Sequence, residues 1–418
     1  MDTPKGWKKT KLGEIADILG GYAFKSSKML SEKAQYQLLK IANLYKGNLD
    51  MTRKPSYWDI SAKNEHNYIL NRGDVVLTLT GTNGKRDYGY SVLINENNSY
   101  LLNQRVARLR ANSSCYAFLF YWTQTNLFLN PFFNAAIGGT GNQANVSVVA
   151  LGSIPISLPP LEEQRAIADL LGCWDEAIET TQKLIAAKEK QFKALLQKLI
   201  ADQCPTNNKS SNWKMIKLGE VCNPITRKNT IGNKNVLTSS AAYGLINQRE
   251  YYNRSVAASN LDGYYLLHNG DFAYNRSSAN GYPFGATKRL DRYSDGVLST
   301  LYLCFSIKDE TKCWSDYLLH FFESGSANRE LRAVCQAGAR SHGLLNITKA
   351  DFYSIKIPLP PLDEQKRIAG VLDTAQREID LLKKLLEKYR EQKRGLMQKL
   401  LTGIWRIKPA VVAEFKGI

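Results

Sequence analysis

Apolar residues recur in steps of four and three along two long stretches of the chain, residues 167–199 and residues 368–400. Positions that recur every 3.5 residues are typical of a coiled-coil seam. We therefore predict two helices of about 40 residues, each roughly 60 Å long. The seam positions are Ile167, Leu171, Trp174, Ile178, Thr181, Ile185, Lys188, Phe192, Leu195 and Leu199, then Ile368, Leu372, Ala375, Ile379, Leu382, Leu386, Tyr389, Lys393, Leu396 and Leu400.

A proline pair opens both predicted helices. Residues 158–164 read Leu-Pro-Pro-Leu-Glu-Glu-Gln, and residues 359–365 read Leu-Pro-Pro-Leu-Asp-Glu-Gln. Proline is tolerated at the start of a helix because its missing N–H has no partner to lose there, and acidic residues in the first turn interact favourably with the helix dipole. The first helix gives way to a polar linker, residues 203–212, and the second stops at Gly403, a residue type common after helix ends.

The apolar stripe of both helices is wider than a two-stranded coiled coil would bury, because further leucines lie outside the seam. They are Leu170, Leu184, Leu196, Leu381, Leu385 and Leu401. The surplus favours partner helices, although packing on the chain's own globular parts would explain it as well. Under the first interpretation, the residues expected to dock partner helices are Ile167, Leu171, Ile178, Leu195, Ile368, Leu372, Leu386 and Leu396.

The proline motif belongs to a longer duplication. Residues 7–15, Trp-Lys-Lys-Thr-Lys-Leu-Gly-Glu-Ile, return as residues 213–221, Trp-Lys-Met-Ile-Lys-Leu-Gly-Glu-Val. Further in, Arg-Gly-Asp-Val-Val-Leu at 72–77 matches Asn-Gly-Asp-Phe-Ala-Tyr at 269–274, each a turn followed by a β-prone run. The pattern predicts that one unit of roughly 200 residues, a globular part followed by a long helix, occurs twice.

The globular parts diverge far more than their borders. Apolar and aromatic runs at 36–44, 75–80 and 297–306 predict short strands, and residues 114–127 and 313–323 predict helices. The predicted fold class is α+β, with two α/β domains that are each followed by a long helix. The expected segments are a first globular domain at 1–157, a first helix at 158–202, a linker at 203–212, a second globular domain at 213–358, a second helix at 359–403 and a tail at 404–418.

The formal net charge of +18 is large for 418 residues. Such an excess attracts polyanions, of which DNA and RNA are the commonest. A basic surface that binds nothing stays the alternative, since charge says nothing about specificity.

The seven cysteines occur singly, with no CxxC pair, which argues against a zinc site and against a disulfide framework. Residues 1–7 lack the apolar core of a signal peptide, and no apolar run approaches the roughly 18 residues that span a bilayer. We expect a reduced, cytoplasmic protein that has no membrane role.

Catalytic signatures are weak. Leu-Asn-Pro-Phe-Phe at 129–133 resembles the loop of amino-methyltransferases but lacks its second proline, and no glycine-rich cofactor loop precedes it. The glycine–lysine pair within 81–86 lacks the spacing of a phosphate-binding loop. The four histidines are isolated from one another and from the cysteines. We predict no catalytic residue, no metal ligand and no enzymatic activity on this chain.

Sequence-specific DNA reading needs only hydrogen-bonding side chains on loops that a rigid scaffold holds. Arginine and lysine pair with guanine, while asparagine and glutamine pair with adenine. Such residues cluster with glycine at 80–86 and 138–143, and at corresponding places of the second unit, 274–278 and 338–343. Ordinary turns would have the same composition. The candidate DNA contacts in these loops are Thr82, Asn83, Lys85, Arg86, Asn142, Gln143, Asn275, Arg276, Ser277, Arg340 and His342.

The paired borders resemble those of the specificity subunits of type I restriction-modification enzymes, through residues 6–14 with 213–220 and residues 158–164 with 359–365. Gly-Tyr-Ala-Phe-Lys-Ser-Ser at 21–27 is also similar to that family's target-recognition domains, which adds Lys25 to the candidate DNA contacts. The resemblance covers essentially the whole chain except its last residues.

The resemblance implies a division of labour. Each globular domain would read one half of a split double-stranded DNA target, and the two helices would pack as an antiparallel coiled coil that sets the gap. Two methyltransferase subunits, which bind S-adenosylmethionine, would dock on the helices, and two restriction subunits would bring ATP and Mg²⁺ chemistry. This chain itself would bind no cofactor.

Other functions stay open at this point. The chain could serve a related system with a bipartite site, or act as a solitary DNA-binding or regulatory chain. A coiled-coil scaffold without DNA specificity is a structural alternative, and an enzyme is the most distant one.

Overall fold

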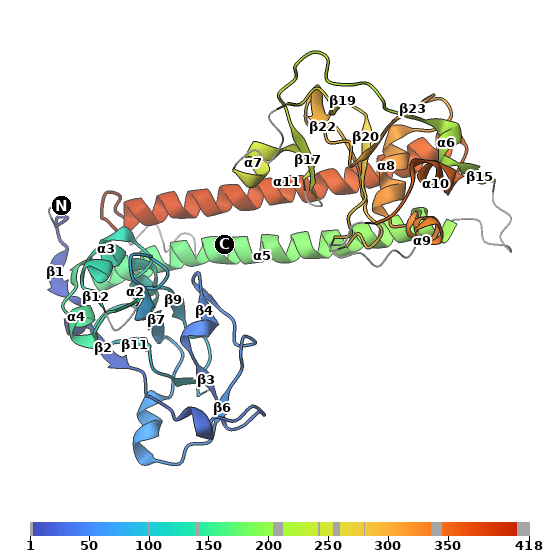
Figure 1. The fold of residues 1–418 in the computed structure, drawn as a ribbon. Coiled ribbons are helices and arrows are strands. Elements are labelled where there is room, and N and C mark those ends of the chain that lie inside the picture. Colours follow the sequence, from blue (N-terminus) through green and yellow to red (C-terminus); the bar gives the residue numbers. More distant parts are fainter. Residues whose placement is uncertain are drawn as a thin grey trace. The chain divides into compact units, whose positions relative to one another are not determined.

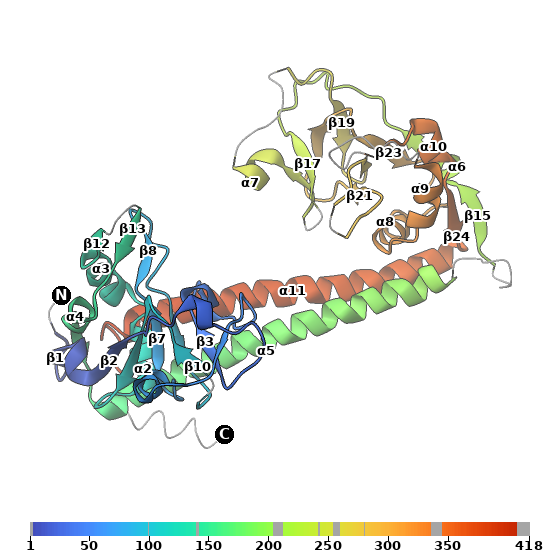
Figure 2. The ribbon, with the colours of Figure 1, turned by 60° about the horizontal axis from the view of Figure 1, so that its bottom comes forward.

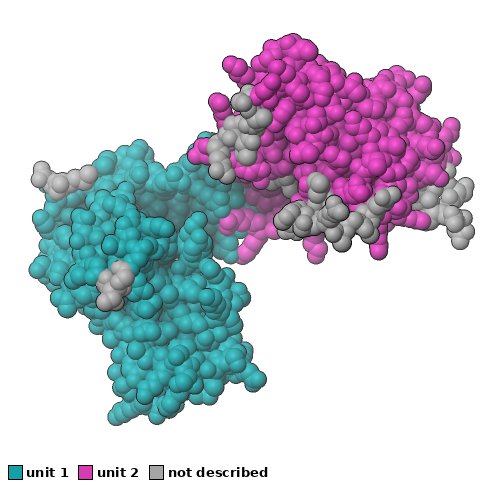
Figure 3. All heavy atoms as spheres, viewed as in Figure 1, with its two compact units in different colours: residues 1–181, 385–418 teal, residues 182–384 magenta. Residues whose placement is uncertain are grey.

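The computed structural model describes residues 3–98, 100–138, 142–203, 212–240, 243–253, 260–279, 281–335 and 345–407. The chain forms two compact units (Figure 3). Unit 1 comprises residues 1–181 and 385–418, and unit 2 comprises residues 182–384. The borders of the units therefore fall inside the two long helices, so that each unit holds one globular part and a segment of both helices.

Each unit is built on an antiparallel sheet of four strands, with the same order in both. Figure 1 labels several of these strands in each unit. In unit 1 the order is β2 (Ala16–Gly20), β11 (Val106–Ala111), β7 (Val75–Thr78) and β9 (Ser91–Leu93). In unit 2 it is β16 (Cys222–Pro224), β23 (Leu303–Ile307), β20 (Phe272–Asn275) and β21 (Ala286–Arg289). The duplication seen in the sequence thus extends to the topology of the fold.

A strand pair joins the two repeated borders of each unit. β1 (Lys8–Lys11) pairs with β14 (Pro155–Leu158), and β15 (Lys214–Lys217) pairs with β24 (Lys356–Leu359). The start of each globular part is therefore fixed beside the entrance to its long helix.

Smaller elements complete each unit. Those of unit 1 are α1 (Leu12–Ile15), η1 (Ser26–Lys28), β3 (Tyr36–Leu39), η2 (Ile41–Asn43), β4 (Leu44–Tyr45), β5 (Asn48–Leu49), β6 (Tyr57–Trp58), η3 (Lys63–Tyr68), β8 (Thr80–Thr82), β10 (Tyr100–Leu102), α2 (Tyr116–Trp122), α3 (Asn126–Asn134), β12 (Ile137–Gly138), β13 (Gln143–Asn145) and α4 (Val148–Gly152). Those of unit 2 are η4 (Ala201–Gln203), α6 (Leu218–Val221), β17 (Leu237–Ser240), β18 (Gly244–Asn247), α7 (Gln248–Tyr252), β19 (Tyr265–His268), β22 (Asp295–Leu298), α8 (Ser315–Glu323), α9 (Asn328–Val334) and α10 (Lys349–Ser354).

The two predicted long helices are present as α5 (Leu161–Leu199) and α11 (Leu362–Leu400). In unit 1, the start of α5 lies beside the end of α11, where the rings of Trp174 and Tyr389 meet at 5.6 Å between centroids. In unit 2, the end of α5 lies beside the start of α11, and Lys188 forms an ion pair with Glu378 at 2.8 Å. The helix segments are therefore antiparallel within each unit.

A buried glutamine explains why the proline motif is repeated. Gln164 donates to the Pro159 carbonyl at 2.8 Å and accepts from the N–H of Cys115 at 2.8 Å. Gln365 donates to the Pro360 carbonyl at 2.8 Å and to the Lys312 carbonyl at 3.0 Å, and accepts from the N–H of Trp314 at 2.7 Å. Because buried backbone groups need partners, each glutamine fixes the start of a long helix to a loop of its own globular part.

The repeated glycine–aspartate turn also has a structural cause. Gly73 and Gly270 adopt φ of +91° and +88°, a region that favours glycine. The following Asp74 and Asp271 are buried. Asp74 accepts from the N–H of Asn71 at 2.7 Å, and Asp271 accepts from the N–H of His268 at 2.5 Å, so that each carboxylate closes the turn before the central strand.

The C-terminal segment, whose role the sequence left open, folds onto the start of unit 1. Arg406 donates from Nε and Nη2 to the buried carboxylate of Glu163, at 2.6 and 2.7 Å, and from Nη1 to the Lys5 carbonyl at 2.6 Å. Its guanidinium also lies 5.7 Å from the ring of Trp7. Residues 404–407 therefore close unit 1, while residues 408–418 lie outside the described part of the chain.

The residues expected to dock partner helices lie mostly in the chain's own packing. Ile167 and Leu171 are fully buried in the core of unit 1, and Ile368 and Leu372 are buried in the core of unit 2. Leu386 is also buried, whereas Ile178, Leu195 and Leu396 are half-buried. A partner could not reach the fully buried leucines and isoleucines without displacing the globular parts, so these are core residues of the chain. Of the leucines outside the seam, Leu196 and Leu401 pack in the chain's own cores, whereas Leu170, Leu184, Leu381 and Leu385 are exposed.

Candidate nucleic-acid interface

The two predicted DNA-reading loops of unit 1 come together in a small sheet formed by β12, β13 and β8 (Figure 2). Thr82 at the end of β8 lies opposite Gln143 in β13, and the N–H of Asn83 donates to the Asn142 carbonyl at 2.9 Å. The side chains of Asn83, Asn142 and Gln143 are exposed. Residues distant in the sequence thus form one surface of amide side chains.

Thr82 serves the shape of this loop. Its N–H and its hydroxyl each donate to the carboxylate of Asp87 at 2.7 Å. These hydrogen bonds, the hydroxyl first, lower the pKa of Asp87, so that its carboxylate is charged at neutral pH. The turn also needs Gly81, because a Cβ there would lie 2.3 Å from the ring of Tyr88. With its hydroxyl engaged by Asp87, Thr82 positions its neighbours.

Arg86 is exposed but held in place by α3. Its guanidinium lies 5.1 Å from the ring of Phe133, and Nη1 donates to the side-chain oxygen of Asn130 at 3.4 Å. Both partners come from the segment whose sequence resembles a methyltransferase loop, and that segment is helical, with Pro131 inside α3. Lys85, one residue earlier, is exposed as well.

The candidate DNA contacts of unit 2 that the structure describes are engaged in hydrogen bonds within the chain. The guanidinium of Arg276 donates to two backbone carbonyls, from Nε to Leu301 at 2.9 Å and from Nη1 to Ile347 at 3.5 Å. Asn275 accepts from the N–H of Ser277 at 3.2 Å. Arg276 therefore ties its loop together. Arg340 and His342 fall in residues 336–344, outside the described residues, so the structure does not bear on them.

Lys25 stands in another part of unit 1. It is exposed and precedes η1, next to Phe24, which is buried with Trp58 in the cluster around the sheet β10-β3-β6. It does not belong to the sheet that carries the two reading loops.

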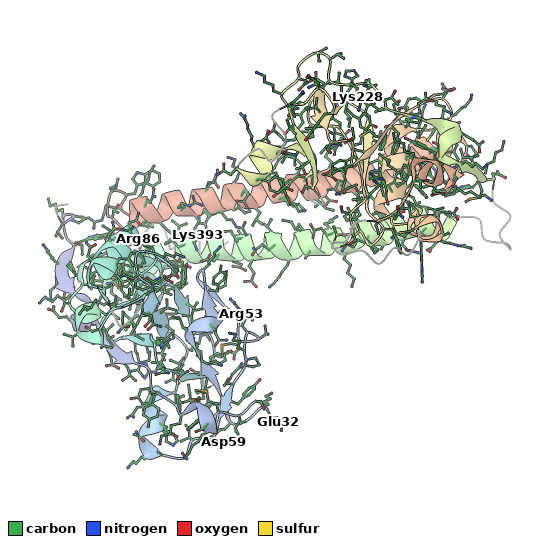
Figure 4. All side chains as sticks on the ribbon, viewed as in Figure 1. Glu32, Arg53, Asp59, Arg86, Lys228 and Lys393 are labelled. Carbon is green, nitrogen blue, oxygen red and sulfur yellow. The ribbon has the colours of Figure 1, made fainter. Side chains whose placement is uncertain are left out.

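A basic hairpin of unit 1 was not among the DNA contacts predicted from the sequence. β4 and β5 are joined by Lys46 and Gly47, and the side chain of Tyr45 is 53 % exposed. The Lys46 ammonium and the Arg53 guanidinium lie 5.3 and 5.1 Å from the ring of Tyr45. Arg53 and Arg86 are labelled in Figure 4. In the sequence, the hairpin is marked by the Lys46–Gly47 pair alone, and such a pair indicates a turn but not a DNA contact.

The described part of the chain contains no group of three or more histidine, cysteine, aspartate or glutamate side chains that could hold a metal ion. Of its histidines, His66 and His268 are exposed, whereas His320 is buried and its Nε2 lies 2.8 Å from Asp373. Among the described residues, no helix combines the length and the apolar character needed to cross a bilayer.

Comparisons with known proteins agree with this architecture. The model of the type I restriction modification DNA specificity domain matches twice, at residues 4–189 and 210–389. Two Methanocaldococcus jannaschii relatives are similar over nearly their whole length. The type I restriction enzyme MjaX specificity subunit is 24 % identical over 97 % of this chain and 95 % of its own, and the MjaVIII specificity subunit is 25 % identical over 98 % and 95 %.

A solved structure shares the fold. The type I restriction-modification S subunit from M. genitalium aligns with a TM-score of 0.56 at 15 % identity, over 96 % of this chain and 99 % of its own. With two matched copies of the specificity domain that together span most of its residues, this chain belongs to the type I restriction modification DNA specificity family.

Proposed function

We propose that the chain is the non-catalytic specificity subunit of a type I restriction-modification complex, in which each globular part reads one half of a bipartite double-stranded DNA target. The observation that carries the proposal is the pair of units, which share a sheet order and buried border contacts but differ in their loops. The net charge of +18 supports DNA as the partner.

The two long helices would act as the spacer between the half-sites, packed as an antiparallel coiled coil. Their antiparallel contacts within each unit support this, as do the 39 residues of each helix, which correspond to roughly 58 Å. Rigid helices of fixed length would hold the two recognition domains at a fixed separation along the duplex.

The chemistry would lie on other subunits. Two methyltransferase subunits would carry S-adenosylmethionine, and two restriction subunits would carry ATP and Mg²⁺. We also propose a cytoplasmic location, since the DNA that the complex reads is there.

Exposed apolar residues on the helices are better docking candidates than the buried seam. Leu170 and Val371 occupy equivalent positions of the two helices and are 37 and 45 % exposed, and Leu184 and Leu385 form a second equivalent pair, 42 and 40 % exposed. Two copies of one partner need two similar surfaces, and these pairs supply one on each helix.

Single substitutions test this docking. Leu170→Glu should remove one methyltransferase subunit from the purified complex, Val371→Glu should remove the other, and the double variant should remove both. Ala186→Glu, at an exposed position of α5 on the side opposite Leu184, is the control. Full complexes from the double variant would overturn the docking assignment.

The function itself is tested by methylation. The chain and its methyltransferase subunits should methylate adenine within one split motif of a random DNA library. Methylation without sequence preference would remove the specificity role, and turnover by the isolated chain would revive an enzymatic one.

A further inference from the structure

A groove of unit 1 lies between the β4–β5 hairpin and α3. The buried Tyr88 and Gly89 and the half-buried Leu129 are among the residues that line it. Gly89 has φ of +77°, and a Cβ there would lie 3.0 Å from the ring of Phe132. The complete lining is Lys46, Gly47, Arg86, Tyr88, Gly89, Tyr90, Ser91, Gln124, Asn126, Leu129 and Phe133. Since Phe132 is fully buried, the glycine lets this segment of the groove wall pack closely on α3.

The charge of the groove has one sign. Lys46 lines it from the hairpin and Arg86 from the loop before β9, and none of the lining residues is acidic. The nearby carboxylate of Asp87 is engaged by Thr82 through two hydrogen bonds. Two cations without a carboxylate between them attract an anion.

The fold holds the side chain of Arg86 and the backbone at Lys46. Arg86 is held by Phe133 and Asn130, as described above. Lys46 has φ of +51° and Gly47 has φ of +77°, so the hairpin turns tightly and its tip is defined. Because the Arg86 side chain is already held in place, it loses less conformational entropy on binding.

The first turn of α3 adds to the same potential. Asn126, the first residue of this nine-residue helix, lines the groove, and the preceding Thr125 makes no side-chain capping hydrogen bond. Its hydroxyl donates to the Trp122 carbonyl at 2.8 Å instead. A helix N-terminus of this kind favours negative charge.

Unit 2 fills the equivalent place with a neutral cluster. Ser91 pairs with Leu77 of β7, and Thr287 pairs with Tyr274 at the equivalent position of β20. Arg86 lies five residues before Ser91, and Tyr282 lies five residues before Thr287, so Tyr282 is the equivalent of Arg86. Lys288 donates to Glu323 at 2.5 Å and to the Tyr282 hydroxyl at 2.8 Å, and that hydroxyl donates to Glu323 at 2.7 Å. The basic groove is therefore a property of unit 1.

We propose that this groove holds a phosphate of the DNA backbone between Lys46 and Arg86, at the start of α3. The inference rests on the proposed function and deepens it, because it makes the β4–β5 hairpin a DNA-contacting element. A backbone contact here fixes the register of the duplex, while the exposed amides of Asn83, Asn142 and Gln143 are left to read base edges.

The test uses the full chain with its methyltransferase subunits. The dissociation constants of a target duplex and of an unrelated duplex are measured over a series of salt concentrations for Lys46→Asn and Arg86→Gln. Asparagine is chosen because it tolerates positive φ. Each variant should weaken binding to both duplexes by the same several-fold factor, and should reduce the slope of log K against log salt by about 1.

Lys9→Gln, at an exposed position of β1 outside the groove, is the charge-matched control and should leave both quantities unchanged. Unchanged salt slopes for both groove variants, or a loss confined to the target duplex, would overturn the phosphate site. Neither result touches the proposed function, which fails separately if the native complex does not discriminate between the two duplexes.

Discussion

Unit 1 and unit 2 agree in the hydrogen bonds of the buried glutamines at their repeated borders, and they differ in the polar contacts of the segments between those borders. The buried Gln164 and Gln365 make matching hydrogen bonds, and the same strands pair in the same order. By contrast, Arg86 faces a groove in unit 1, whereas the equivalent position of unit 2 holds Tyr282 in a closed cluster. We call the glutamine contacts and the common strand order the frame of each unit. The comparison teaches that the loops can differ in sequence because these frame contacts do not involve the residues that differ.

The largest loss of stability should follow substitution of Gln365, which makes three of the buried hydrogen bonds. Gln365→Leu leaves three backbone groups without their partner, whereas Gln164→Leu leaves two. An unsatisfied buried group costs about 1–3 kcal/mol. We expect Gln365→Leu to lower the free energy of unfolding of unit 2 by about 4 kcal/mol, and Gln164→Leu to lower that of unit 1 by less. Amide hydrogen exchange, followed separately in peptides of each unit, measures both.

Equal losses in the two units, or losses below about 1 kcal/mol, would contradict the role of the glutamines in the frame. Gln365→Glu should also destabilise unit 2, because it keeps the acceptor for Trp314 but places a buried carboxylate against the Lys312 and Pro360 carbonyls.

A second effect separates the closed cluster of unit 2 from the open groove of unit 1. Lys288 is only 5 % exposed, so Glu323→Gln leaves a buried ammonium without its carboxylate. Breaking such a pair costs roughly 3 kcal/mol. Thermal unfolding should show this loss for Glu323→Gln and almost no loss for Arg86→Gln, whose side chain is exposed. Similar melting temperatures for both variants would contradict the difference between the closed cluster of unit 2 and the open groove of unit 1.

A smaller effect concerns the acidic residues at the starts of α5 and α11. Glu163 is buried and bound by Arg406, whereas the equivalent Glu364 pairs with the exposed Arg367 at 3.5 Å. A hydrogen bond to a buried charge contributes about 2 kcal/mol, and an exposed ion pair contributes roughly 0.5 kcal/mol or less. Urea unfolding of Arg406→Ala should therefore show a clear loss in unit 1, and Arg367→Ala should be close to native. The reverse order would contradict the closure of unit 1 by its C-terminal segment.

The smallest expected effect is a difference in the reactivity of the cysteine thiols. Burial raises the pKa of the Cys304 and Cys313 thiols to about 12, which keeps both protonated at neutral pH. Cys173 on α5 is exposed. Brief alkylation of the native chain should label Cys173 and spare the two buried thiols of unit 2, as judged by peptide mass spectrometry, with the urea-unfolded chain as the control. Rapid labelling of Cys304 would show that the core of unit 2 opens readily.

The sequence predicted the repeated borders because they are short, contiguous motifs, but it did not predict the hydrogen bonds of Gln164 and Gln365 to loops 49 and 51 residues away along the chain. The proline pair, the acidic first turn and the glutamine all lie within seven residues, and so do the turn and strand around Gly73 and Asp74. The two long helices followed from their periodicity for the same reason. Neither prediction required knowledge of long-range pairing.

The remaining features depend on residues far apart in the chain. A 3.5-residue seam shows that a stripe is covered but not by what, which is why Ile167 and Leu372 were expected to dock partners and are core residues instead. Lys46 and Arg86 become neighbours of one groove only through the fold, and the two-residue strands of the hairpin carry no pattern. Arg276 stood in the expected loop, but its bonds to Leu301 and Ile347 could not be read from spacing.

The most direct test of the central claim, that each unit reads its own half of the target, is a map of methylated adenines. The chain with Asn83, Asn142 and Gln143 each changed to alanine is expressed with its methyltransferase subunits, and the methylated motif is compared with that of the native chain. All three side chains are exposed in unit 1, so the fold should be preserved. The account predicts that one half of the motif relaxes while the other half and the gap stay the same. Relaxation of both halves, or of neither, would contradict it.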